Sequence, residues 1–433
     1  MTGSPQPVSA AVRGLSFPMC LALVMGNMIG SGMFLLPASL APYGWNAVFG
    51  WMFTIGGALA LALTIARLTR ARPEARDPAG FVEAAFGRTT SFLIGWSYWV
   101  SIWAANVTIA VAAVSYISIF VRAIGTTPHL PALLAVGLLW AVTLINLQGA
   151  RSAGLFQIVT MILKLVPVIV VLAIMALVLG REGAAAIAPF PAQGLSVSAI
   201  TASATLTLFA LLGFESCAVA AAKVENPERN VPRATMMGTL LTGLIYLIIC
   251  SGIALMLPAG EVAGSDAPFQ IFVARFWADG PALLIGLFAA ISALGALNGW
   301  VLMQGEQPLA LARRGLLPAW FAATDTRGTP VRALILSSVL ASAFVLINSN
   351  RAMADLFTYL ALLSTSATLW LYLAVACAGL KLRIAMPIAM IGALYSLWAL
   401  WGAGLWVSGL SFVLMASGLP FYWWARRSNA TAT

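Results

Sequence analysis

The chain has 433 residues, of which 61% are hydrophobic and only 8% are charged. A soluble domain of this size would carry about 25% charged residues, so this composition excludes soluble enzymes and soluble binding modules. The net charge of +10 would suit a nucleic-acid-binding protein, but the membrane topology described below explains it better, and no nucleic-acid partner is expected.

The apolar runs of the chain predict an all-α polytopic membrane protein. A helix needs about 20 apolar residues to cross the hydrocarbon core of a bilayer. Twelve candidate spans meet this requirement, at residues 16–41, 46–69, 83–121, 131–149, 155–180, 196–222, 234–258, 281–308, 332–348, 354–380, 384–403 and 405–424. Residues 1–15 and 425–433 are then short terminal tails.

The basic residues divide unequally between the two sides of the membrane. With twelve spans, both termini lie on one side, together with 18 of the 23 basic residues. Those on the other side are Arg122, Arg181, Arg275 and Arg351. Because loops rich in Lys and Arg stay in the cytoplasm, we expect a cell (inner) membrane protein with both termini cytoplasmic.

A glycine-rich interruption, Gly30-Ser31-Gly32, lies inside the first span. Glycine is a poor helix former, so this stretch predicts local unwinding. The freed N–H groups at the start of the second half-helix would form an anion site suited to a substrate carboxylate. The carbonyls that end the first half-helix would suit an α-ammonium. The alternative is that these small residues only allow close helix packing.

Two ionisable residues lie at membrane depth. Lys164 is in the fifth span, three residues before Pro167, and Glu215 follows Gly213-Phe214 in the sixth. A charge at the bilayer centre costs about 2.5–3.5 kcal/mol on insertion scales, and burial favours the neutral form of either group. Both are therefore candidates for proton coupling. The alternatives are a lysine that reaches the cytoplasmic interface and a structural carboxylate held by hydrogen bonds to span 1.

The interruptions at Gly30 and Gly213 lie five spans apart. Five is an odd number, so a repeat of five spans would be inverted in the membrane, as in many secondary transporters. We therefore expect a first repeat over residues 16–180, a second over 196–380, and an accessory helix pair over 384–424, with helices 1 and 6 broken in a LeuT-like arrangement.

Cofactor and metal sites are not expected. The four cysteines lie in apolar runs, and the single histidine, His129, falls in a short loop, so no metal-ligand spacing is present. The same absence argues against a membrane enzyme, and no filter loop of a channel is recognisable.

Three stretches resemble a known family. They are GNMIGSGMFLLP at 26–37, GFES at 213–216 with ENPERNVPRAT at 225–235, and Gly299-Trp300 in the eighth span. They are similar to the amino acid–polyamine–organocation (APC) transporters, and most closely to the basic amino acid/polyamine antiporter branch that includes the arginine/agmatine antiporter. The resemblance covers essentially the whole chain.

The resemblance implies a substrate site midway across the membrane. Ser31 and the backbone around it would hold the substrate carboxylate, Trp300 would stack on the substrate, and Glu215 would sense protons. Asn106 and Ser364 match positions that contact a guanidinium. The remaining predicted substrate-binding residues are Asn27, Ile29, Gly30, Gly32, Tyr98, Phe209 and Leu212.

The chain departs from the arginine/agmatine antiporter at several positions. Phe209 stands where that antiporter has a tryptophan gate, and Ile102 and Ile109 replace a cysteine and a methionine. Lys164 replaces a small apolar residue and instead resembles proton-coupled, sodium-independent permeases. In that role its ammonium would take the place of a bound sodium and brace span 1 against span 8.

We therefore expect an alternating-access exchanger of cationic amino acids or their decarboxylated amines. Its partners would be a small-molecule amino acid or polyamine substrate, protons and the lipid bilayer. A proton-coupled permease for neutral amino acids is the alternative: Lys164 and Phe209 favour it, whereas Asn106 and Ser364 oppose it. The sequence leaves the oligomeric state open, with a homodimer among the options.

Overall fold

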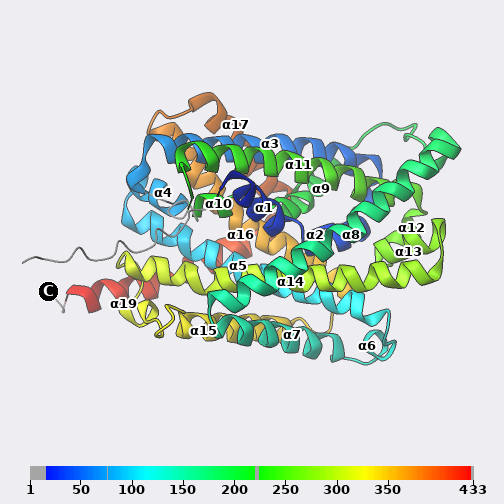
Figure 1. Cartoon of the computed structure of the whole chain (residues 1–433). Helices are drawn as coiled ribbons and strands as arrows, with labels where there is room; N and C mark the ends of the chain where they lie inside the picture. Colours follow the sequence, from blue (N-terminus) through cyan, green and yellow to red (C-terminus); the bar gives the residue numbers. More distant parts are fainter. Residues whose placement is uncertain (1–15, 76, 220–223, 431–433) are drawn as a thin grey trace, which may run out of the picture.

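The computed structural model describes residues 16–75, 77–219 and 224–430. The predicted tail 1–15, the last three residues of the other tail, and the basic residues Arg13, Arg76 and Lys223 lie outside this part of the chain. Helices make up almost all of the described residues (Figure 1). The all-α polytopic fold class predicted from the apolar runs is thus confirmed.

The helices follow the predicted spans closely. Within the described residues, eight helices are long and apolar enough to cross a membrane, three shorter apolar helices accompany them, and one further pair is bent by 42° at a break. In chain order the spans are α1 (Phe17–Met28) with α2 (Ser31–Leu40), α3 (Trp45–Ala71), α5 (Arg88–Ser118), α7 (Leu130–Leu147), α8 (Ala150–Glu182), α9 (Val197–Leu211) with α10 (Ser216–Val219), α11 (Pro227–Met256), α14 (Asp279–Arg313), α15 (Val331–Ile347), α16 (Met353–Lys381), α17 (Met386–Gly402), and α18 (Leu405–Ala416) with α19 (Leu419–Ala430).

The short elements lie at the two ends of the bundle, and one of them corrects a predicted boundary. The third span does not begin at residue 83, because α4 (Pro78–Phe86) is a separate helix. Gly87 turns the chain at φ +83°, a conformation that favours glycine, before α5 starts at Arg88. At the opposite end lie α6 (Ala123–Thr126), α12 (Ala259–Ala263) and α13 (Pro268–Phe276). These two ends are called the α19 end and the α13 end below.

The two halves pack in the same way. If each span is replaced by its counterpart five spans away, one observed helix contact becomes another observed contact. Helix α3 packs on α9 as α11 packs on α1, α5 packs on α16 as α14 packs on α8, and α5 packs on α15 as α14 packs on α7. The broken pairs α1–α2 and α9–α10 lie in the middle of the bundle, between the layer of α3 and α11 and the layer of α5 and α14 (Figure 1). This position brings the two breaks together.

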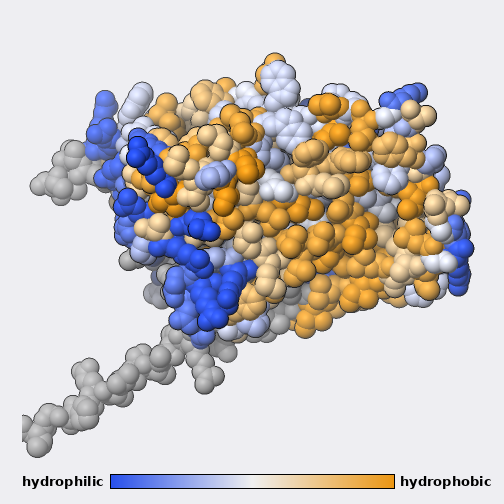
Figure 2. All heavy atoms as spheres, turned by 90° about the horizontal axis from the view of Figure 1, so that it is seen from above, coloured by the Kyte–Doolittle hydropathy of each residue, from blue (hydrophilic) through white to orange (hydrophobic). Residues whose placement is uncertain are grey.

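The surface carries a broad apolar belt between two polar ends (Figure 2). Large side chains exposed in this belt include Ile169 on α8, Ile248 on α11 and Leu394 on α17. Strongly hydrophilic residues gather most densely at the α19 end. In water such a belt would be an aggregation hazard, so it is the surface that faces lipid.

Candidate functional site

The first span is broken at Ile29 and Gly30. Helix α1 ends at Met28, Ile29 takes an extended conformation (φ −72°, ψ 99°), and α2 starts at Ser31 with no side chain capping its N-terminus. Helix α14 approaches so closely that a Cβ atom on Gly30 would lie 2.6 Å from the Cβ of Ala296. Glycine is required here by this contact, and the start of α2 presents backbone donors toward the middle of the bundle.

The sixth span is broken between Leu212 and Glu215. Helix α9 ends at Leu211, and Gly213 has φ +106°, a conformation that L-residues with a side chain rarely adopt. A Cβ atom on Gly213 would lie 3.4 Å from the Cβ of Asn27. The two breaks predicted from the glycine pattern therefore face one another directly.

A small cavity lies where the breaks meet. Its volume is about 20 Å³, and it is lined by Asn27, Met28, Gly30, Ser31, Gly32, Ala105, Ile109, Phe209, Ala210, Leu212, Ala296 and Trp300. Seven of the eleven predicted substrate-binding residues belong to this lining, namely Asn27, Gly30, Ser31, Gly32, Phe209, Leu212 and Trp300. A volume of this size holds about one water molecule, so the cavity must widen to admit an amino acid.

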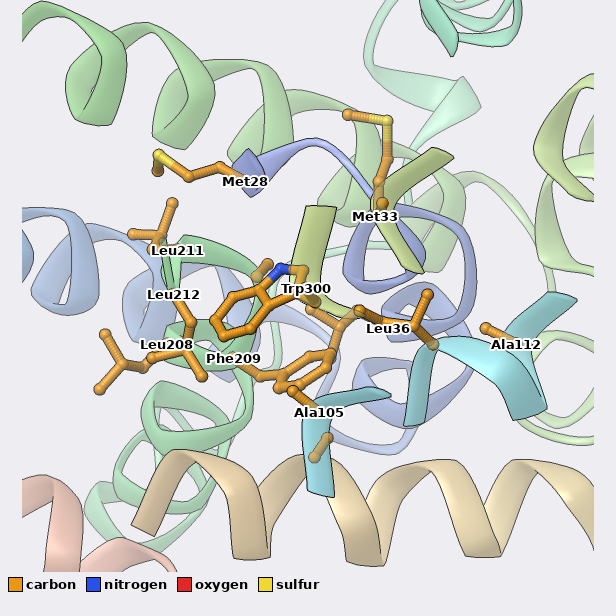
Figure 3. Packing of buried hydrophobic residues seen from close by; sticks show 14 of the residues in the cluster. Met28, Met33, Leu36, Ala105, Ala112, Leu208, Phe209, Leu211, Leu212 and Trp300 are labelled. Atoms are coloured by element: carbon orange, nitrogen blue, oxygen red, sulfur yellow. The ribbon is translucent and has the colours of Figure 1, made fainter. Parts of the chain in front are cut away.

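Two aromatic side chains, Trp300 and Phe209, belong to the lining of the cavity. Trp300 and Phe209 project toward one another across it (Figure 3). Phe209 also packs edge-on against Phe357, with ring centroids 5.8 Å apart. Phe357 lies one turn after Met353, which lines an open hollow of about 580 Å³ at the α13 end. Phe209 and Phe357 thus lie between the cavity and that hollow.

The carbonyls that end α1 are already occupied by side chains. Lys164 Nζ on α8 donates to the oxygens of Gly26 (2.8 Å) and Ile29 (2.9 Å). The Tyr246 hydroxyl on α11 donates to Met28 O at 2.6 Å. These contacts correct the expectation that the carbonyls are open to an α-ammonium. Lys164 is completely buried, and its hydrogen bonds to α1 brace span 1 against span 5 rather than span 8.

Glu215 is clamped between two tyrosines. Its Oε1 accepts from the Tyr98 hydroxyl at 2.7 Å, and its Oε2 accepts from the Tyr372 hydroxyl at 2.9 Å and from the Gly213 N–H at 3.2 Å. Phe214 stacks on Tyr372 with ring centroids 4.9 Å apart. Three donors around one buried carboxylate stabilise its ionised form against the cost of burial. The sequence did not single out Tyr372, because a tyrosine within an apolar helix gives no signal of its own.

A larger cavity opens from this clamp toward the α19 end. It has a volume of about 190 Å³ and includes Tyr98, Asp77, Glu306 and Arg314 in its lining. Arg314 pairs with Asp77 at 3.1 Å and with Glu83. We call this larger cavity the vestibule, and Glu215 with Tyr98 and Tyr372 the Glu215 clamp. Tyr98 belongs to both, so the clamp lies between the vestibule and the small cavity.

Ile29 and Tyr98 are absent from the lining of the small cavity, and so are the two residues predicted to contact a guanidinium, Asn106 and Ser364. Asn106 Nδ2 on α5 donates to Gln304 Oε1 at 2.7 Å and to Trp300 O at 3.3 Å. The Ser364 hydroxyl on α16 donates to Ser101 O at 2.9 Å. Both side chains are completely buried between helices. Among the described residues, no group of three or more His, Cys, Asp or Glu side chains could hold a metal ion.

Comparisons with known proteins agree with this architecture. A family model for amino acid permeases matches residues 15–431. The chain is 31% identical over 423 residues to the cadaverine/lysine antiporter of Escherichia coli (strain K12), and the match covers 93% of each chain. It is 30% identical to the putrescine transporter PotE of the same strain, with 88% of this chain and 89% of that one covered. PotE of Haemophilus influenzae (strain ATCC 51907 / DSM 11121 / KW20 / Rd) is 31% identical over 401 residues, 88% of this chain and 90% of its own length. The chain therefore belongs to the amino acid permease family of the APC superfamily, and it is a multi-span membrane transporter, not an enzyme.

Proposed function

We propose that this transporter exchanges a cationic amino acid for a linear diamine across the cell membrane. The observation that carries the proposal is the meeting of two broken helices at a cavity capped by Trp300 and Phe209. The names of the relatives, cadaverine/lysine antiporter and putrescine transporter, support substrates that end in a primary ammonium. The apolar wall formed by Ala105 and Ile109 suits a methylene chain better than a guanidinium.

In the proposed mechanism the substrate docks between the breaks. Its carboxylate binds the uncapped N-terminus of α2 around Ser31 and Gly32, where backbone donors and the helix dipole favour an anion. Its aliphatic chain lies between Trp300 and Phe209, and the indole face attracts the cationic end. The Glu215 clamp then opens toward the vestibule at the α19 end, which by its basic residues faces the cytoplasm.

Counterflow in proteoliposomes tests this proposal. Vesicles loaded with unlabelled cadaverine should accumulate labelled lysine, and external cadaverine or putrescine should compete with it. Arginine and agmatine should compete more weakly. Uptake of alanine or serine, without competition by any diamine, would instead establish a neutral amino acid permease. The Lys164 ammonium at the first break favours that second candidate, because it places a fixed positive charge beside the site.

We further propose that Glu215 makes transport sensitive to pH. Replacing Glu215 with glutamine keeps the side-chain size but removes the titrating group, so lysine counterflow should become nearly independent of pH between pH 5 and 8. The rate is measured at each pH with identical buffers on both sides of the membrane. A Glu215→Gln variant that keeps the parent's pH profile would rule out this role.

Tyr372→Phe is the matched control for the carboxyl group. It retains Glu215 but removes one of the donors to the ionised form. Loss of such a donor favours protonation, so the midpoint of the pH profile should move to higher pH while its shape is kept. An unmoved midpoint would mean that the Tyr372 hydroxyl does not act on the titrating group.

Trp300 provides a test of the aromatic contact. Trp300→Ala should weaken lysine and cadaverine binding more than Trp300→Phe does, because phenylalanine retains a π face and a cation–π contact contributes about 0.5–2 kcal/mol. Binding is measured by inhibition of labelled lysine counterflow. If both variants lose the same affinity, the indole acts by filling space and not through its ring face.

A further inference from the structure

A directional chain of hydrogen bonds lies behind the cavity wall. It links Thr143 on α7, Ser338 on α15, Gln304 on α14 and Asn106 on α5, and all four side chains are completely buried. Each bond is short: Thr143 Oγ1 to Ser338 Oγ is 2.8 Å, Gln304 Nε2 to Ser338 Oγ is 2.8 Å, and Asn106 Nδ2 to Gln304 Oε1 is 2.7 Å.

The direction of this chain is fixed at one end by a backbone carbonyl. Thr143 Oγ1 lies 2.7 Å from Leu139 O, which can only accept, so the Thr143 proton is used there. Ser338 must then donate to Thr143, and its oxygen is left to accept from Gln304. Gln304 therefore turns its amide nitrogen toward Ser338 and its oxygen toward Asn106. A flipped Gln304 would bring two acceptors together at Ser338.

The other end of the chain is an acceptor with no partner. Asn106 gives its amide N–H groups to Gln304 Oε1 and to the carbonyl of Trp300. Its Oδ1 atom is buried and has no hydrogen-bond partner within the described part of the chain. A buried acceptor of this kind destabilises the protein unless it is paired. Asn106 follows Ala105, which lines the cavity, and its bond to Trp300 holds it against the same wall.

We infer that Gln304 is a positioning residue that sets the substrate preference by fixing the amide of Asn106 with its oxygen as the free acceptor. The acceptor serves the distal ammonium of the substrate when the cavity widens. This inference rests on the proposed function, since it takes the substrate to be a lysine-like amino acid or a diamine. A substrate with a methyl group in place of the distal ammonium would leave Asn106 Oδ1 unpaired and should therefore bind more weakly. Gln304 contacts no substrate itself.

A pair of ligands that differ only at the distal group tests the inference. Lysine is compared with 2-aminoheptanoic acid, whose terminal methyl stands where lysine has its ammonium, as inhibitors of labelled lysine counterflow by the full-length protein in proteoliposomes. In Gln304→Met the Asn106 amide loses its short bond to Gln304 and keeps only the longer one to the Trp300 carbonyl (3.3 Å), so its orientation is held less firmly. The inhibition constant of 2-aminoheptanoic acid divided by that of lysine measures the preference for the ammonium. This ratio should fall about 10-fold or more, as expected for loss of one hydrogen bond to a charged group.

Two further variants separate positioning from a structural role. Ser337→Ala is the matched control, since Ser337 bonds the backbone oxygen of Gln304 and the indole of Trp99 but is not part of the chain; its ratio should stay at the parent's value. Adding Asn106→Asp to Gln304→Met should restore the lysine preference, because a carboxylate presents an acceptor in either orientation. If Gln304→Met does not fold, Ser338→Ala releases Gln304 from the same chain and should lower the ratio in the same direction.

The outcomes distinguish this inference from the proposed function. A parent protein that binds both ligands equally overturns the proposed function itself. The role of Gln304 is overturned if the parent prefers lysine and folded Gln304→Met keeps the same preference. If Gln304→Met does not fold, an unchanged preference in Ser338→Ala overturns it instead. Equal weakening of both ligands, with the ratio unchanged, also overturns it, because it assigns the chain to helix packing alone. A fallen ratio that Asn106→Asp fails to restore overturns the assignment of Asn106 Oδ1 as the acceptor.

Discussion

Gly30→Ala is expected to abolish counterflow. The added methyl group would lie 2.6 Å from the Cβ of Ala296 on α14, far inside van der Waals contact, and neither Cβ atom can rotate away from the other. Overpacking of this kind costs about 1–3 kcal/mol, and relief of the contact would push the start of α2 away from the cavity. Initial rates of lysine uptake in counterflow measure the loss, and gel filtration in detergent establishes that the variant remains folded.

The contact can be relieved from the other side. Ala296→Gly removes the opposing Cβ atom, so Gly30→Ala with Ala296→Gly should recover most of the transport. Recovery is incomplete because glycine inside α14 costs about 1 kcal/mol of helix stability. Ala296→Gly alone should transport nearly as well as the parent. If the double variant is as inactive as Gly30→Ala, the requirement for glycine lies in the backbone of the break and not in this contact.

Lys164→Met is expected to give the second large effect, a loss of both stability and transport. Methionine fills a similar space but donates no hydrogen bond, so the oxygens of Gly26 and Ile29 lose their donor in a buried position. Each unpaired carbonyl costs about 1–3 kcal/mol. The melting temperature in detergent should fall by several degrees, and counterflow should fall with it.

Lys164→Gln and ion replacement complete this test. Glutamine can donate to one of the two carbonyls, so it should retain part of the stability that methionine loses. In the parent, replacing sodium by choline should leave the rate of transport unchanged, since the Lys164 ammonium stands at the end of α1. A parent that requires sodium, or a Lys164→Met variant as stable as the parent, would contradict the bracing role.

The fold and the two breaks were predictable from the sequence because their signals are local. The length of each apolar run fixes a span, and Gly30 and Gly213 interrupt two of them at positions where the backbone must leave the helix. The separate helix α4 was missed, although the polar residues Arg88-Thr89-Thr90-Ser91 follow Gly87 and interrupt the apolar run. A single glycine there did not distinguish a turn from a packing contact.

The partners of the ionisable residues were not predictable in the same way. Glu215 and Lys164 stand out as charges in apolar runs, but Tyr98, Tyr372 and Tyr246 are ordinary residues for a membrane helix. Their roles depend on which faces of distant helices meet. For the same reason the family resemblance could suggest a substrate contact for Asn106, but could not reveal that its amide donates to Gln304.

The ionisable residues also have consequences for how the chain is inserted into the bilayer during synthesis. Lys164 lies in the most apolar of the eight long spans, Ile162–Ala186, with a mean hydropathy of 3.0. The apolar residues around it therefore offset the cost of inserting its charge into the bilayer before the later spans are made. Its acceptors, on α1, have been made before it. Glu215 is translated after Tyr98 but before Tyr372, which lies in α16. Its carboxylate therefore lacks the Tyr372 donor while four further spans are synthesised. The hydrogen bonds around Glu215 are complete only when the tenth span has left the ribosome.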